Sequence, residues 1–112
     1  MPKDFKVFID DILEAISSII FYTKNMSYES FINDKKTIDA VVRNLEIIGE
    51  ATKGIPETIR VKNPEIEWQR IVGLRNVLIH QYSGIDLEVV WDIIVNKLPL
   101  LQKQITHILE TS

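Results

Sequence analysis

Apolar residues recur every three or four positions along most of this chain, the spacing that gathers them on one face of an α-helix. One run covers residues 4–22 and contains Phe5, Phe8, Ile9, Ile12, Ile16, Ile19 and Ile20. A second covers residues 35–53, with Gly54 expected to end it, and contains Ile38, Val41, Val42, Leu45, Ile48, Gly49 and Thr52. A third follows Asp86, its expected N-cap, and contains Leu87, Val90, Ile94, Leu98, Leu101, Ile105 and Ile108. We expect Pro99 to kink or restart this last helix.

Short helical segments are expected between the long ones. Ser27 can cap a segment that extends to residue 32, and Asn33 or Asp34 can cap the helix that follows. Pro56 suits the first turn of a segment over residues 56–61, and Asn63-Pro64 marks a break. With one further helix, these elements predict four main helices with short connections. The expected fold is an all-α, antiparallel helical bundle that forms a single domain over residues 1–112.

The fourth main helix should begin near Glu67, and it carries a mixed pattern. The 100° step per residue places two arcs on opposite sides, one with Trp68, Ile71, Leu74, Leu78 and Ile79 and the other with Gln69, Gly73, Asn76 and His80. Arg75 falls within the apolar arc, where an unpaired guanidinium is costly. We therefore expect Arg75 to be paired, to lie at a subunit interface or to face a water-filled cleft. Glu46 is the candidate partner, unless it belongs to a solvated ion-pair face of its own helix.

The geometry of an ideal helix separates the two most reactive side chains. Asn76 and His80 are one turn apart on the same face, so that the amide can orient the imidazole. Arg75 lies about 140° from His80, and one regular helix cannot direct both toward a single phosphate. Either the helix ends near His80, or a second copy of the chain contributes its own pair across a two-fold axis. A homodimer would also bury three apolar side chains that lie off the main stripes, Ile47, Trp91 and Ile93.

Composition supports a helical, cytoplasmic protein. The chain has four glycines, four prolines and no cysteine, which favours helix over sheet and excludes disulfides and thiolate metal sites. The N-terminus lacks a signal-peptide pattern, and no apolar run is long enough to span a membrane. The net charge of −3 argues against strong sequence-independent attraction to nucleic acid. Any nucleic acid would therefore have to be bound locally.

The groups between Gly73 and Tyr82 can perform phosphate chemistry without a metal or cofactor. No Gly-rich phosphate loop and no Asp/Glu/His cluster at metal-ligand spacing is present in the sequence. His80 can donate or accept a proton near neutral pH, and Arg75 can hold phosphate oxygens. These suffice for RNA cleavage by the neighbouring 2′-OH, with Asn76 orienting His80 or the ribose. A lone histidine is more often a helix-terminal residue bonded to a carbonyl, and Tyr82 can be a core ring, so the residues alone leave both readings open.

The segment Arg75-Asn-Val-Leu-Ile-His-Gln-Tyr82 resembles the Arg-x4-His-x-Tyr signature of the HepT toxins in the HEPN superfamily. The segments RNLEIIGEA from Arg43, IVGLRN after Trp68, and GIDLEVVW up to Trp91 resemble the family's helices in the same order. The resemblance therefore covers essentially the whole chain. It implies a HEPN-like homodimer with a composite cleft, acting as a metal-independent endoribonuclease toxin of a type VII toxin–antitoxin system. Arg75 and His80 would be its essential residues.

The same resemblance implies a protein partner. HepT toxins are encoded beside a minimal nucleotidyltransferase antitoxin, MntA, which can transfer AMP from ATP onto the motif tyrosine, here Tyr82. An adenylyl group next to the phosphate-binding Arg75 would repel RNA. Two other readings stay open: a non-catalytic module that binds a nucleotide or the antitoxin through Arg75 and His80, and a purely structural helical dimer.

Overall fold

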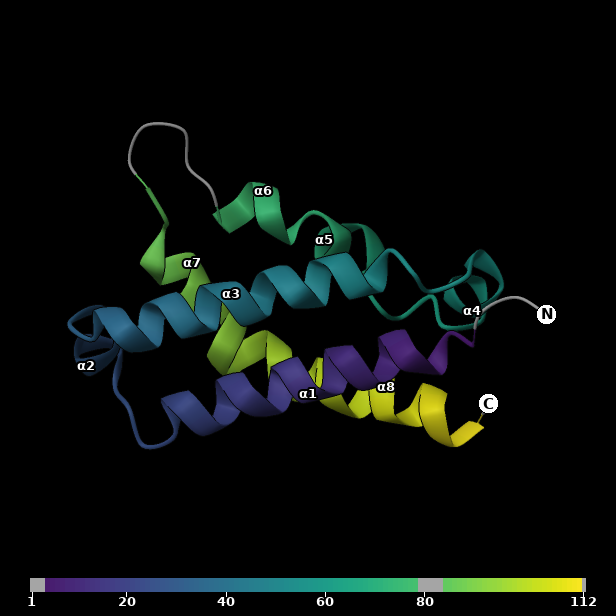
Figure 1. Ribbon diagram of the computed structural model, residues 1–112, viewed down its shortest axis with the longest axis horizontal. Coiled ribbons are helices and arrows are strands. Elements are labelled where there is room, and N and C mark those ends of the chain that lie inside the picture. Colours follow the sequence, from purple (N-terminus) through teal and green to yellow (C-terminus); the bar gives the residue numbers. More distant parts are fainter. Residues whose placement is uncertain (1–3, 79–83, 112) are drawn as a thin grey trace.

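Two long antiparallel helices form the framework of the protein. The computed structural model describes residues 4–78 and 84–111 (Figure 1). Helix α1 (Lys6–Thr23) packs along α3 (Lys35–Thr52), and the short α2 (Tyr28–Ile32) joins them at one end. Both long helices bury most of the stripes predicted from their spacing, with Ile20 on α1 exposed. The all-α fold expected from the sequence is confirmed for the described residues.

Residues 87–111 form one nearly continuous helical stretch. Helix α7 (Leu87–Asp92) leads through a π-helical turn, η1 (Ile93–Lys97), into α8 (Leu98–Thr111), which returns along α1 (Figure 1). Pro99 is the second residue of α8. Because proline lacks an N–H and its ring crowds the carbonyl four residues earlier, a locally widened turn accommodates it. The irregularity expected at Pro99 is thus present as a π-turn.

Between α3 and α7, the described residues form three short helices: α4 (Glu57–Lys62), α5 (Trp68–Val72) and α6 (Leu74–Leu78). The sequence predicted one helix from residue 67, and this prediction is wrong in one respect, because Gly73 divides it. Gly73 has φ −84° and ψ 7°, whereas a continuing α-helix needs ψ near −42°. The break rotates α6 relative to α5, so the side chains after Gly73 no longer follow the arcs of one ideal helix.

Side-chain caps begin three of the helices, α2, α3 and α7. The Ser27 hydroxyl accepts from the Ser30 N–H, and the Asp86 carboxylate accepts from the N–H groups of Glu88 and Val89. Asp34 accepts from the Thr37 N–H at 3.1 Å, and this hydrogen bond lowers the pKa of the Asp34 carboxyl. The predicted caps at these three positions are confirmed.

The end of α3 differs from the expectation. The helix stops at Thr52, and Gly54 does not have the positive φ of a C-terminal glycine stop. A Cβ at Gly54 would instead lie 2.6 Å from the ring of Phe8 on α1. Glycine is therefore needed here for the packing of the loop after α3 against α1, not for a left-handed backbone.

The core is formed mainly by α1, α3 and α8, and α2, α5, α6, α7 and η1 each add one or two buried side chains. Its largest fully buried members are Phe31, Ile9, Ile12, Ile16, Ile19, Leu45, Ile48, Leu78, Leu98, Ile105, Ile108 and Val41. Ile47, Trp91 and Ile93 are partly buried against this core, and the Trp91 ring lies 5.1 Å from that of Phe31. A single chain therefore already covers much of the surface for which a dimer was expected.

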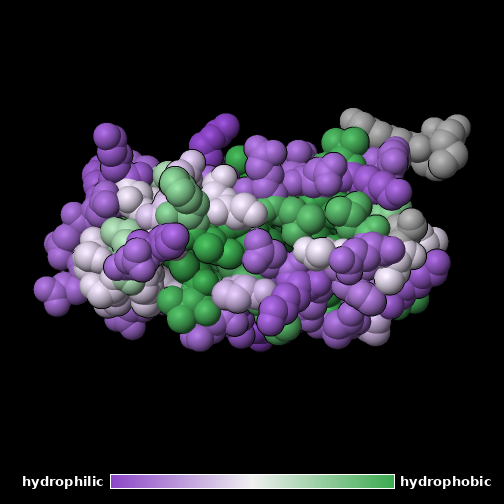
Figure 2. Space-filling view, turned by 90° about the horizontal axis from the view of Figure 1, so that it is seen from below, coloured by the Kyte–Doolittle hydropathy of each residue, from purple (hydrophilic) through white to green (hydrophobic). Residues whose placement is uncertain are grey.

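Part of one face of the molecule is apolar. Figure 2 shows a band of hydrophobic surface, bordered by hydrophilic residues, on the side formed by α1 and α8. Exposed large apolar side chains on these two helices are Val7, Ile20, Phe21, Tyr22 and Leu100. Within the described part of the chain, no helix is long and apolar enough to cross a membrane.

Replacing Gly54 with alanine should destabilise the fold by about 1–3 kcal/mol, because the new methyl group meets the Phe8 ring. Urea unfolding measures this cost. In a Phe8→Ala background the same replacement should cost much less, since the obstructing ring is gone. Equal costs in the two backgrounds would contradict the packing role of Gly54.

Candidate active site

Helix α6 presents the motif arginine to solvent. Leu74 and Leu78 are buried in the core, whereas Arg75 and Asn76 between them are exposed. The expectation that Arg75 lies within the apolar arc is wrong, because the break at Gly73 turns α6. An exposed guanidinium keeps its hydration and needs no protein partner. Neither Arg75 nor Asn76 has a side-chain hydrogen bond or ion pair with another described residue.

The predicted Glu46–Arg75 ion pair is not formed among the residues that the structure describes. Glu46 lies half-buried on α3, where it lines a hollow with Arg43, Glu50 and residues of α1. Glu50 pairs with Lys53 at 2.9 Å, and Asp39, near the start of α3, pairs with Lys35 at 3.3 Å. The alternative reading, a solvated ion-pair face on α3, fits these contacts better.

Two motif residues lie outside the described residues, namely His80 and Tyr82. The expected contact of Asn76 with His80 and the convergence of Arg75 with His80 involve this segment and stay predictions. Among the described residues, no group of three or more histidine, aspartate or glutamate side chains is arranged to hold a metal ion.

The position of α6 depends on a close approach of α5 to α3. A Cβ at Gly49 would lie 3.2 Å from the carbonyl oxygen of Ile71 and 3.8 Å from the Leu74 Cβ. Because Gly49 has no side chain, the end of α5 and the start of α6 can pack directly on the α3 backbone. Arg75 follows Leu74 in the chain and is thereby held at a defined place on a rigid support.

An arginine outside the motif organises the segment that leads into α5. The Arg60 Nε donates to the Ile55 carbonyl at 3.1 Å, and its Nη2 donates to the Thr52 carbonyl at 2.9 Å. The guanidinium carbon lies 6.0 Å from the Trp68 ring centre, and the indole N–H donates to the carbonyls of Arg60 and Asn63. These bonds tie α4 and α5 to the end of α3.

The sequence pattern does not indicate this role of Arg60. A basic residue in a short helix is ordinarily a solvated surface residue, and nothing in its neighbours identifies the carbonyls that it reaches. The only local signal is the preceding Pro56, which turns the chain back after α3. Tertiary packing brings the Arg60 side chain to the carbonyls of Thr52 and Ile55.

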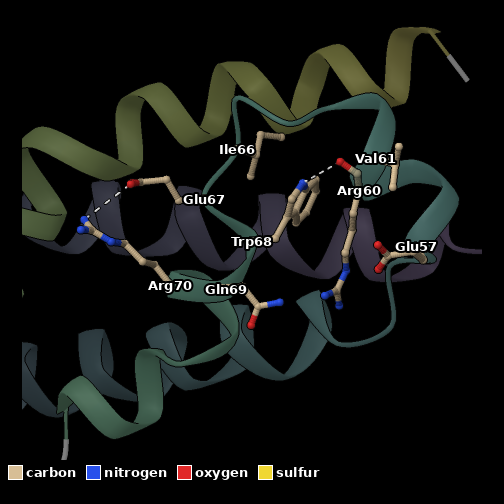
Figure 3. A pocket seen from close by; sticks show the side chains of 8 residues that line it. All are labelled: Glu57, Arg60, Val61, Ile66, Glu67, Trp68, Gln69 and Arg70. Atoms are coloured by element: carbon tan, nitrogen blue, oxygen red, sulfur yellow. Dashed lines mark hydrogen bonds and ion pairs between the residues drawn. The ribbon is translucent and has the colours of Figure 1, made fainter.

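A hollow opens between α4 and α5, and we call it the α4–α5 hollow. Its volume is about 350 Å³, and it is lined by Glu57, Arg60, Val61, Ile66, Glu67, Trp68, Gln69 and Arg70. Figure 3 shows the Arg60 guanidinium between the side chains of Glu57 and Gln69, while Arg70 points away toward Glu67. The hollow immediately precedes, along the chain, the helix that carries Arg75.

Comparison with known proteins shows one family across most of the chain. The family described as "Ribonuclease HepT-like" matches residues 12–108. Two proteins of Methanocaldococcus jannaschii, "Putative RNase MJ1216" and "Putative RNase MJ0127", are 49% and 46% identical over 98% of this chain and 92% of their own. "Probable ribonuclease HepT" of Thermococcus cleftensis is 42% identical over 91% of this chain and 93% of its own. No solved structure matches the chain significantly.

Replacing Arg60 and Arg75 separately with alanine tests which of the two side chains supports the fold. Arg60→Ala should lower the free energy of unfolding by about 2 kcal/mol, because it removes charge-assisted hydrogen bonds to the carbonyls of Thr52 and Ile55. Arg75→Ala should change it by no more than about 0.5 kcal/mol, since the side chain is exposed. Urea unfolding of both variants measures the difference. A large loss in Arg75→Ala would mean that Arg75 supports the fold and is not reserved for a ligand.

Proposed function

Because this chain belongs to the HepT-like ribonuclease family, we propose that it is a metal-independent endoribonuclease whose active site forms where the motifs of two identical chains meet. The observation that carries this proposal is the exposure of Arg75 on a helix whose other face is buried. A guanidinium placed in this way is hydrated in the free protein and ready to bind a phosphate. The rigid packing of α5 and α6 on α3 supports such a role.

RNA supplies its own nucleophile for this reaction. His80 removes the proton of the 2′-OH, whose oxygen attacks the adjacent phosphorus. The bond from phosphorus to the 5′-oxygen of the next nucleotide breaks, that oxygen receives a proton from an imidazolium, and a 2′,3′-cyclic phosphate remains. Arg75 neutralises the charge that builds up on the non-bridging oxygens, and Asn76 orients His80 or the ribose. No metal ion is required for any of these steps.

A homodimer would explain how Arg75 and His80 act on the same phosphate, although one regular helix directs these two side chains apart. Across a two-fold axis, each motif would lie opposite its copy, so that Arg75 of one chain and His80 of the other can act on one phosphate. The net charge of −3 means that RNA must be attracted by this cleft and not by the overall charge of the protein.

The biological role that we propose is that of a cytoplasmic toxin which inhibits growth by cutting RNA and is controlled by a nucleotidyltransferase antitoxin. The Tyr82 oxygen would attack the α-phosphorus of ATP, pyrophosphate would leave, and AMP would stay attached to the ring. The added phosphate would place a negative charge beside the cleft and exclude RNA.

Purified protein should cleave single-stranded RNA in the presence of EDTA and leave cyclic phosphate ends, while the same sequence made of DNA should stay intact. Arg75→Ala and His80→Ala should each lower the rate at least about 100-fold, because each removes a group that acts in the transition state. Gel analysis of end-labelled oligonucleotides measures both effects.

The matched control is Arg43→Ala, which removes an exposed arginine on α3 and should leave cleavage unchanged. Full activity in His80→Ala would refute the mechanism. Tight RNA binding without any turnover in the unmodified protein would indicate the non-catalytic module instead.

Incubation with ATP and the cognate nucleotidyltransferase should increase the mass of the chain by AMP and abolish RNA cleavage. Tyr82→Phe should gain no AMP and stay active, because it lacks the acceptor oxygen. Tyr22→Phe retains Tyr82 and should gain AMP and lose cleavage, as the protein of unaltered sequence does. Intact-mass spectrometry and the cleavage assay report the two effects. Transfer of AMP to Tyr82→Phe would show that another residue is the acceptor.

A further inference from the structure

The flat guanidinium group of Arg60 is held in a fixed position in the α4–α5 hollow. Two nitrogens of Arg60 are held by the carbonyls of Ile55 and Thr52, and the guanidinium lies over the indole of Trp68. Its remaining nitrogen, Nη1, has no hydrogen bond to another described residue. Arginine planes are surfaces on which unpaired RNA bases stack. Because this plane is already immobilised, a ligand would not have to order it on binding.

Groups with hydrogen-bonding capacity surround this plane. Figure 3 places the Gln69 amide on one side of the Arg60 guanidinium and the Glu57 carboxylate on the other. The amide offers a donor and an acceptor, the carboxylate offers acceptors, and Nη1 offers donors. Neither Gln69 nor Glu57 uses its side chain in a hydrogen bond or ion pair with another described residue. This combination suits the edge of a nucleobase, which both donates and accepts.

The charges in the hollow favour a base over a phosphate. Two carboxylates, Glu57 and Glu67, balance two guanidinium groups, Arg60 and Arg70, and Arg70 is directed to Glu67 at 3.5 Å. An anion therefore gains little here, whereas an uncharged base can use every polar group and the apolar wall of Val61 and Ile66.

The hollow is also close to the motif along the chain. Arg75 comes six positions after Gln69, with the break at Gly73 between them. We propose that the α4–α5 hollow binds one nucleobase of the RNA strand near the cleaved bond and so gives cleavage a base preference. The inference rests on the proposed ribonuclease function for its biological meaning, but binding of a base to the hollow can be tested without cleavage.

The direct test uses the fluorescence of Trp68. The chain has two tryptophans, so Trp91→Phe leaves Trp68 as the only reporter. Adenosine, guanosine, cytidine and uridine are titrated separately, with ribose 5-phosphate as the phosphate control. At least one nucleoside should quench the signal saturably, and Gln69→Ala should weaken its binding about fivefold, the cost of one hydrogen bond. Gln104→Ala on α8 is the matched control and should have no effect.

The second test uses cleavage of a randomised RNA pool, with product ends read by sequencing. The unaltered protein should prefer one base at a position near the cut. Gln69→Ala and Glu57→Gln should flatten this preference and raise KM about fivefold with kcat unchanged, while Glu65→Gln, which lies outside the hollow, should retain it.

The outcomes separate the two proposals. Saturable quenching without any RNA cleavage would support the hollow as a base site and contradict the ribonuclease function. Cleavage with a base preference that both variants retain, or quenching that is absent or unchanged in Gln69→Ala, would overturn the inference about the hollow and leave the ribonuclease function in place.

Discussion

The contact between the backbone of α3 at Gly49 and the Ile71 carbonyl at the end of α5 determines where the motif helix lies. Helix α3 packs against α1 on one side and against α5 and α6 on another, so its buried stripe must serve both contacts. A side chain larger than hydrogen at residue 49 would separate these layers. Helices α5 and α6 therefore pack closely on α3, which α1 supports from its other side.

The break at Gly73 leaves the polar side chains of α6 exposed to solvent. In an unbroken helix, Arg75 would follow the apolar arc into the core, where its charge would be costly without a partner. The turn at Gly73 lets Leu74 and Leu78 anchor α6 while Arg75 and Asn76 stay in solvent. A short helix that is rigid on one face and solvated on the other is well suited to hold a cation for a polyanionic substrate.

Arg60 and Arg75 show two distinct uses of the same side chain within sixteen residues of chain. Arg60 donates to the carbonyls of Thr52 and Ile55 at and just after the end of α3, and it stabilises the position of Trp68. Arg75 has no such bond to the described residues. The structural arginine shapes the wall of the α4–α5 hollow, and the exposed arginine is the one that the family signature contains.

The sequence by itself determined the features that depend only on residues close together in the chain. Apolar spacing placed the buried faces of α1, α3 and α8, and short-range hydrogen bonds placed the caps at Ser27, Asp34 and Asp86. The motif identified the family for the same reason, since it is a contiguous string. Only the tertiary structure decided that Gly73 breaks a helix, that Arg75 lies outside the core and that Arg60 reaches back to Thr52. Each of these depends on contacts between segments that are distant or differently oriented, and helical periodicity contains no information about such contacts.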